Sequence, residues 1–180
     1  MTKKNIPNIL SIIRLIMIPA FVAVFFSEDA PRYRSMLIFL AAELTDVADG
    51  YLARRFGWIT EIGKILDPMA DKLMQAAAMV SLAIENDFFI WIATLFFAKE
   101  LVMVSGALVL MKKQKKVTAS SWFGKMATVI FAAVTLVFIM YPDNFALDVI
   151  LTAILGGALI FALLMYYFTV FRKFEKQNKE

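Results

Sequence analysis

Four aspartates lie close together in a chain whose composition is otherwise that of a membrane protein. They are Asp46, Asp49, Asp67 and Asp71, all within the segment 46–71. The 180 residues are 61% hydrophobic, with a mean hydropathy of +0.73, which is more apolar surface than one small water-soluble core can bury. An aspartate near the centre of a membrane helix costs about 2.5–3.5 kcal/mol on insertion scales. These carboxylates must therefore face a protein interior, water or a metal ion.

The spacing of the segment predicts how these side chains are arranged. One set of residues recurs at i, i+3, i+4, i+7 and i+8, and a second set recurs at i, i+4 and i+8, so each set lines one face of a helix. The first set is Asp46, Asp49, Gly50, Ala53 and Arg54, and the second is Gly63, Asp67 and Asp71. Two such helices turned toward each other would gather four carboxylates around one point.

Apolar runs predict six membrane-spanning helices, each near the ~20 residues that cross a bilayer core of ~30 Å. The runs lie at roughly 6–26, 33–53, 62–84, 88–111, 122–141 and 146–171. The second and third runs are the least apolar, because the aspartates interrupt them. The first run contains Arg14 and is not followed by an A-x-A-like cleavage site, so we expect a retained helix rather than a signal peptide. The predicted fold is an all-α, six-transmembrane-helix bundle, with residues 1–180 as a single domain.

Basic residues predict the orientation of this bundle. They gather on alternate loops, which are cytoplasmic by the positive-inside rule. The prediction is an N-in/C-in bundle whose carboxylates open toward the cytoplasm. Topology and anionic lipid headgroups explain the net charge of +4 better than nucleic-acid binding does. The residues are Lys3, Lys4, Arg54, Arg55, Lys64, Lys112, Lys113, Lys115, Lys116, Arg172, Lys173, Lys176 and Lys179.

The side chains that are available to bind a metal ion and a phosphate indicate phosphoryl transfer. The sequence has no cysteine and no histidine, so oxygen must hold any metal ion, and hard carboxylates favour Mg²⁺ or Mn²⁺. Four carboxylates can hold two such ions, and a paired-metal site clamps the oxygens of a phosphoryl group. Gly50 and Gly63 lack a Cβ and let a bulky group approach the helix backbones. Arg54 offers a planar fork suited to phosphate oxygens.

The pattern Asp46-x2-Asp49-Gly50-x2-Ala53-Arg54-x8-Gly63-x3-Asp67-x3-Asp71 resembles the signature of the CDP-alcohol phosphotransferase family. The resemblance implies an integral membrane enzyme in which the hydroxyl of a second alcohol displaces CMP from a CDP-linked lipid. It also implies two Mg²⁺ or Mn²⁺ ions per site and a homodimer. It makes all four aspartates metal ligands and Asp71 also the general base. The residues that it assigns to CDP binding are Gly50, Ala53, Arg54 and Gly63.

Further motifs narrow the resemblance within the family. The opening Asn5-Ile6-Pro7-Asn8-Ile9-Leu10-Ser11, followed by Arg14, resembles bacterial phosphatidylglycerophosphate synthases, and so does Trp122-x-Gly124-Lys125. Those enzymes join CDP-diacylglycerol to glycerol 3-phosphate at the cell membrane and release CMP. An anionic acceptor needs cationic partners, and the candidates are Arg14, Lys72, Lys99 and Lys125. The chain departs from the expected Ala-Arg-Glu at Ala98-Lys99-Glu100, where lysine lacks the bidentate fork of arginine.

Other functions stay open at this point. Cardiolipin synthases share the aspartate signature and use phosphatidylglycerol as acceptor, and transfer to inositol phosphate or serine is a further possibility. A different class is a divalent-cation transporter, in which the carboxylates form a transit site. The aspartates can also be read as a structural network paired with Arg54 and Lys72.

Several single residues also have a structural reading. Arg14 can reach the membrane interface by snorkelling, and Lys99 and Glu100 can form an internal salt bridge. Lys125 can be simply a charge that sets the topology. Small residues in the fourth and sixth apolar runs predict close helix crossings there. These residues are Gly106, Ala107, Gly156, Gly157 and Ala158.

Overall fold

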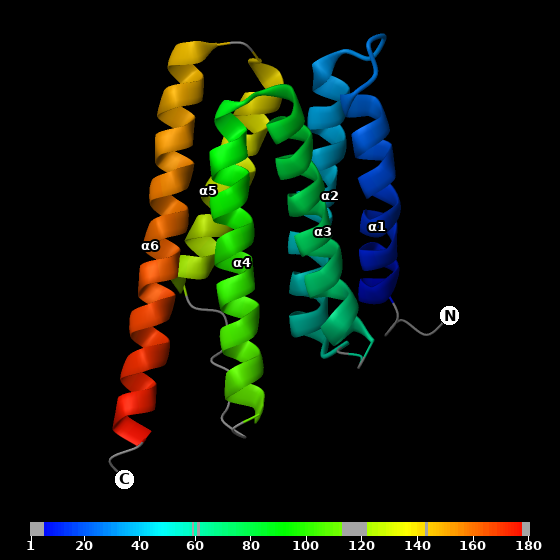
Figure 1. Cartoon of the computed structure of the whole chain (residues 1–180). Helices are drawn as coiled ribbons and strands as arrows, with labels where there is room; N and C mark the ends of the chain where they lie inside the picture. Colours follow the sequence, from blue (N-terminus) through cyan, green and yellow to red (C-terminus); the bar gives the residue numbers. More distant parts are fainter. Residues whose placement is uncertain (1–5, 59, 61, 113–121, 143, 178–180) are drawn as a thin grey trace. The chain divides into compact units, whose positions relative to one another are not determined.

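The computed structural model describes residues 6–58, 60, 62–112, 122–142 and 144–177. These residues form six helices and no strand (Figure 1). The helices are α1 (Ile6–Phe25), α2 (Arg32–Phe56), α3 (Gly63–Glu85), α4 (Phe88–Lys112), α5 (Trp122–Met140) and α6 (Phe145–Gln177). Every helix begins and ends within a few residues of its predicted apolar run, except that α6 continues past position 171. The all-α prediction is confirmed for the described residues.

Three of the helices contain segments long and apolar enough to cross a membrane. These segments are Pro7–Phe25, Phe89–Gly106 and Phe145–Thr169, with mean hydropathies of 2.2, 1.6 and 2.4. The apolar part of α5, Gly124–Met140, is shorter. The charged residues of α2 and α3 lower their mean hydropathy, as the sequence predicts for the two helices that carry the aspartates. The composition of the helices is therefore that of a membrane protein.

Part of the basic pattern cannot be followed in the structure. Asn5, Lys3, Lys4, Lys113, Lys115, Lys116 and Lys179 lie outside the described residues, and so do the side chains of Arg54, Lys64, Lys112, Arg172, Lys173 and Lys176.

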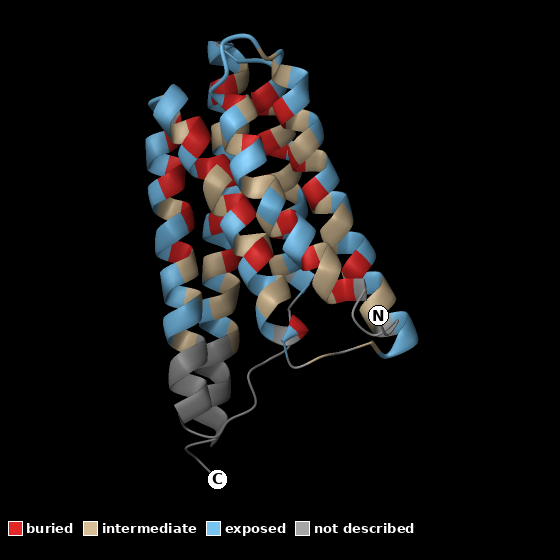
Figure 2. Cartoon of the chain, turned by 90° about the vertical axis from the view of Figure 1, so that its right-hand side faces the viewer, coloured by how far each residue is buried: buried red, intermediate tan, exposed pale blue. Residues whose placement is uncertain are grey.

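Contacts divide the chain into two compact units. The first unit contains α1, α2 and α3 together with Thr135–Pro142, and the second contains Asn86–Val134 and the residues from Asp143 onward. Buried positions alternate with exposed ones along each helix (Figure 2). This is the pattern expected of helices that pack through one face and present another to their surroundings.

In the first unit α1 packs against both α2 and α3. The ring of Phe21 lies 5.6 Å from that of Phe25 and 6.0 Å from that of Phe39, between centroids. Arg32 lies over the ring of Phe25 and forms an ion pair with Glu85. Aromatic packing and this ion pair therefore join the three helices at the end that carries the α1–α2 connection.

Two local features turn the chain from α2 into α3. Gly57 ends α2 in the left-handed region, with φ 66° and ψ 24°, and its N–H donates to the carbonyl of Ala53. Glycine adopts this conformation without the steric cost that a Cβ would add. The N–H of Trp58 also donates to the carbonyl of Ala53, at 3.1 Å. These bonds satisfy a carbonyl at the end of α2 and start the return of the chain.

The start of α3 is held against the first turn of α1. Thr60 Oγ1 donates to Asn8 Oδ1 at 2.8 Å and accepts from the N–H of Gly63 at 2.9 Å. A Cβ on Gly63 would lie only 2.6 Å from Asn8 Oδ1 and 2.9 Å from Thr60 Oγ1. Glycine at position 63 therefore has a packing reason, because only a residue without a side chain allows this approach.

In the second unit α4 and α6 lie side by side and run in the same direction (Figure 1). Tyr166 donates to the carbonyl of Met103 at 3.2 Å, and a Cβ on Gly106 would lie 2.6 Å from the Tyr166 hydroxyl. The close crossing predicted at Gly106 is thus confirmed. At Gly156 and Gly157 the described residues of the chain show no such crossing, since a Cβ at either position would meet nothing within 4 Å.

Candidate active site

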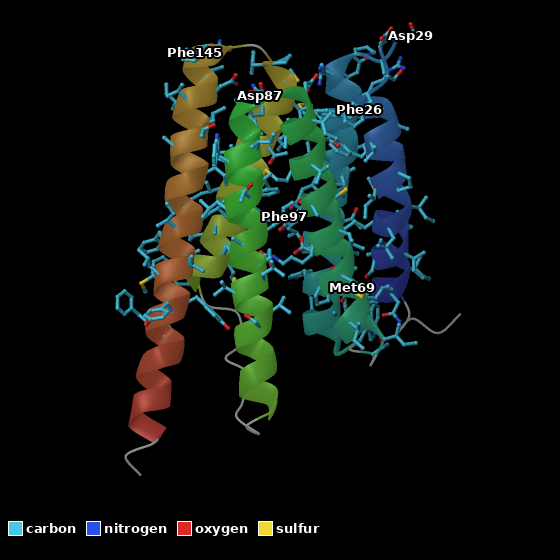
Figure 3. All side chains as sticks on the ribbon, in the orientation of Figure 1. Phe26, Asp29, Met69, Asp87, Phe97 and Phe145 are labelled. Atoms are coloured by element: carbon cyan, nitrogen blue, oxygen red, sulfur yellow. The ribbon has the colours of Figure 1, made fainter. Side chains whose placement is uncertain are left out.

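The four aspartates all belong to the first unit. Asp46 and Asp49 lie in the second half of α2, and Asp67 and Asp71 lie in the first half of α3. Figure 3 shows Met69, which lies between the two α3 aspartates, at the end of this unit opposite Asp29. Asp49 lies within electrostatic range of both Asp46 and Asp67. The two halves of the pattern therefore share one electrostatic environment.

Arg14 of α1 is the principal partner of the α2 aspartates. Its Nη1 donates to Asp46 Oδ1 at 2.7 Å, and its Nη2 donates to Asp49 Oδ2 at 2.5 Å. The Arg14 side chain is 1% exposed, that of Asp49 is 2% exposed and that of Asp46 is 39% exposed. The guanidinium is therefore held inside the unit by two carboxylates, whereas snorkelling requires an exposed charged end. Removing one member of such a buried pair typically costs about 3–5 kcal/mol.

Each α3 aspartate has a polar partner that the sequence analysis did not identify. Ser11 of α1, which is fully buried, donates to Asp67 Oδ1, and its Oγ also lies 3.0 Å from the carbonyl of Pro7. Because a hydroxyl has one hydrogen, it serves one acceptor at a time. Buried Gln75 donates to Asp71 Oδ1 at 2.8 Å. The available signal was helical spacing, because Ser11 precedes Arg14 by three residues and Gln75 follows Asp71 by four.

The carboxylate oxygens of the four aspartates are ligands that suit a hard divalent ion, although these carboxylates do not surround one point. Among the described histidine, cysteine, aspartate and glutamate side chains, no group of three or more is arranged to hold an ion. Asp46 and Asp49 meet at the guanidinium of Arg14, whereas Asp67 and Asp71 meet donors of their own. All four side chains offer carboxylate oxygen, the ligand that Mg²⁺ and Mn²⁺ prefer.

The residues assigned to CDP binding have different positions in the first unit. Gly50 and Ala53 lie on α2 in the helical turns after Asp46, and the carbonyl of Ala53 caps the end of that helix. Gly63 is the first residue of α3 and is buried against Asn8. The backbone of Arg54 belongs to α2, while its side chain lies outside the described residues.

The four cationic acceptor candidates are divided between the two units. Arg14 is held by the α2 aspartates, and Lys72 follows Asp71 directly on α3. Lys99 and Lys125 belong to the second unit. Buried Lys99 pairs with Glu100 at 2.6 Å and lies over the ring of Phe96, so the internal salt bridge is present. Lys125 is exposed near the start of α5.

The chain is similar in sequence to proteins that are named for the synthesis of phosphatidylglycerophosphate. A relative from Haemophilus influenzae named CDP-diacylglycerol–glycerol-3-phosphate 3-phosphatidyltransferase is 40% identical over 133 residues, covering 70% of this chain and 70% of the relative. A relative of the same name from Escherichia coli K12 is 38% identical over 129 residues, covering 69% and 70%. A Mycobacterium tuberculosis H37Rv protein named probable phosphatidylglycerophosphate synthase is 32% identical over 160 residues, covering 87% and 75%.

A family model described as CDP-alcohol phosphatidyltransferase matches residues 4–171, which include the whole of α1 to α5 and α6 as far as Phe171. The match spans most of both units and the whole aspartate pattern. The signature resemblance, the helices that carry it and this match agree. The chain belongs to the CDP-alcohol phosphatidyltransferase family.

Proposed function

We propose that this protein transfers the phosphatidyl group of CDP-diacylglycerol to glycerol 3-phosphate, giving phosphatidylglycerophosphate and CMP. The main support is that all eight positions of the signature lie on α2 and α3 of one compact unit. In addition, similar proteins are named for this reaction. The relatives favour glycerol 3-phosphate over phosphatidylglycerol as acceptor. The enzyme class follows from the family and the acceptor from the relatives.

In the proposed reaction Asp71 accepts the proton of the acceptor hydroxyl. The hydroxyl oxygen forms a bond to the phosphorus that carries the diacylglycerol, and the bond from that phosphorus to the CMP oxygen breaks. CMP leaves with the electron pair of that bond. Gln75, which donates to Asp71 Oδ1 at 2.8 Å, fixes the orientation of the base. A positioned carboxylate of this kind typically contributes about 10²–10⁴-fold to the rate.

Asp46, Asp49, Asp67 and Asp71 would hold two Mg²⁺ or Mn²⁺ ions, which neutralise charge on the transferred phosphoryl group when bound. Gly50, Ala53, Arg54 and Gly63 would line the cytidine diphosphate site, with Arg54 supplying positive charge to the diphosphate. Among the acceptor candidates, Arg14 and Lys72 belong to the same unit as the four aspartates. Lys99 and Lys125 remain candidates from the second unit.

The proposed setting is a six-span bundle with both termini in the cytoplasm. The support is the alternation of basic loops in the sequence and the agreement of the six helices with the six apolar runs. The aspartate end of the first unit, which is also the end where α1 begins, then faces the cytoplasm, where CDP-activated lipids are made and used. The homodimer expected from the family resemblance stays a prediction, which the mass of the purified protein would test.

Parallel acceptor assays test this proposal. Purified protein would receive labelled CDP-diacylglycerol and Mg²⁺ or Mn²⁺ with glycerol 3-phosphate, phosphatidylglycerol, inositol phosphate or serine, and CMP release would be measured. We expect release chiefly with glycerol 3-phosphate. Release chiefly with phosphatidylglycerol would identify a cardiolipin synthase instead. Absence of CMP release with every acceptor, together with Mn²⁺ uptake into proteoliposomes, would favour the transporter.

A further inference from the structure

Arg14 contributes a fixed positive charge to the part of the site where divalent ions are expected. It comes from α1, whereas both of its carboxylate partners come from α2. Each terminal nitrogen of the guanidinium serves a different carboxylate, at 2.7 Å for Asp46 and 2.5 Å for Asp49. Each carboxylate uses one oxygen for this contact and accepts no other hydrogen bond from the described residues. The guanidinium thus bridges two residues of the signature.

The buried position of this cation has an electrostatic cause. Asp46 and Asp49 lie three residues apart on one helix, and Asp67 acts on Asp49 as well, so the carboxylates repel one another strongly where water is scarce. Arginine is suited to offset this repulsion permanently, because its guanidinium keeps its charge and its fork reaches two acceptors. The Nε of Arg14 has no hydrogen-bond partner in the described part of the chain. Its terminal nitrogens alone therefore carry the interaction.

We infer that Arg14 is a built-in counter-ion of the carboxylate site, which holds Asp46 and Asp49 together when no divalent ion is bound. This inference rests on the proposed function, because it takes these aspartates to be metal ligands. Arg14 and the divalent ions then compete for the same two carboxylates, those of Asp46 and Asp49. Arg14 is accordingly a positioning residue that makes the fold less dependent on metal and lowers the affinity for metal. This differs from the role expected from sequence, in which Arg14 binds the phosphate of the acceptor.

The test compares Arg14→Gln with Arg32→Gln in the full-length protein in detergent. Arg32 is the matched control, because it also joins helices of the first unit through an ion pair, with Glu85, at the opposite end. Thermal unfolding would be followed in EDTA and across a Mn²⁺ titration. We expect Arg14→Gln to lower Tm in EDTA, to recover most of that loss with Mn²⁺, and to bind Mn²⁺ about tenfold more tightly than wild type. Arg32→Gln should gain no more from Mn²⁺ than wild type gains.

Arg14→Lys keeps the test decisive if Arg14→Gln does not fold. Lysine retains the charge but lacks the fork, so one carboxylate loses its partner. We expect a gain in Tm from Mn²⁺ that exceeds the wild-type gain. A Tm loss that Mn²⁺ does not reverse in either variant would assign Arg14 a purely structural role and overturn the inference. Unchanged response to Mn²⁺ with a raised KM for glycerol 3-phosphate would return Arg14 to acceptor binding and overturn it as well.

Measurement of CMP release on the same samples separates the two proposals. If wild type releases CMP while Arg14→Gln responds to Mn²⁺ as wild type does, the inference on Arg14 is lost and the proposed function stands. If wild type shows Mn²⁺ binding and the expected Arg14→Gln response but releases no CMP with any acceptor, Arg14 is a counter-ion of a metal site that serves another function. Wild-type protein that neither binds Mn²⁺ nor releases CMP removes both.

Discussion

The site residues are held by contacts between helices rather than by neighbours along one helix alone. Arg14 and Ser11 reach across from α1 to Asp46, Asp49 and Asp67, while Gln75 donates to Asp71 along α3 itself. Helical spacing predicted which residues share a face. It did not predict these pairs, because spacing within one helix contains no information on which side chain of another helix lies opposite.

Asp71→Asn tests the base. The substitution keeps the shape and the contact with Gln75 but removes the negative charge that accepts the proton, so we expect turnover to fall by about 10²-fold or more with little change in Tm. CMP release and thermal unfolding measure the two effects. Asp29→Asn, at an exposed position in the α1–α2 connection, is the control and should leave both values unchanged. Near-normal turnover of Asp71→Asn would exclude Asp71 as the base.

Ser11→Ala tests whether the buried hydroxyl positions Asp67. The change removes a donor to a carboxylate, a hydrogen bond worth roughly 1.5–3 kcal/mol, and we expect lower kcat and weaker Mn²⁺ binding. Ser27→Ala, at an exposed serine of the α1–α2 connection, should change neither. Equal Mn²⁺ affinity for Ser11→Ala and wild type would show that Asp67 does not need this donor.

At the scale of helices, apolar runs predicted both ends of α1 to α5 and the start of α6 to within a few residues, because each run is bounded by polar or turn-forming residues. The left-handed end of α2 at Gly57 was not predicted. Nor could the run lengths distinguish Gly106, which meets Tyr166 across a helix contact, from Gly156, which faces open space. Small residues permit a close crossing but do not determine where one occurs.

Gly57→Ala tests the end of α2. A Cβ at this position meets no neighbouring atom within 4 Å, so the only cost is the left-handed backbone, about 1–2 kcal/mol. We expect a lower Tm in detergent. Gly156→Ala is the matched control, since it adds a methyl group to open space inside a helix and should be neutral or stabilising. Equal Tm values for the two variants would contradict a special conformation at position 57.

Gly106→Ala tests the contact between α4 and α6. The new methyl group would overlap the Tyr166 hydroxyl, and we expect a loss of about 1–3 kcal/mol. Tyr166→Phe removes that hydroxyl and its bond to the carbonyl of Met103. In a double-mutant cycle, Gly106→Ala should therefore cost less in the Tyr166→Phe background than in wild type. Additive losses would show that Tyr166 does not restrict position 106.

At the scale of the whole molecule, composition and the basic loops predicted a membrane protein with a defined orientation. The lack of cysteine makes that orientation directly testable. A cysteine introduced at Ser27 should react with a membrane-impermeant maleimide added to intact cells, whereas one at exposed Ile62 should react only after permeabilisation. The reverse labelling pattern would show that the bundle is inverted and that the carboxylates open to the outside.

The contacts of α1 also bear on how the protein is made. In its first turns, Asn8 contacts Thr60 just before α3, and Ser11 contacts Asp67. Arg14 contacts the two aspartates of α2. Since translation proceeds from the N-terminus, the two donors among them, Ser11 and Arg14, enter the membrane before the aspartates to which they donate. Each acidic helix can therefore leave the translocon beside a partner that neutralises or binds its carboxylates. The order of the helices in the gene lowers the cost of inserting the two least hydrophobic ones.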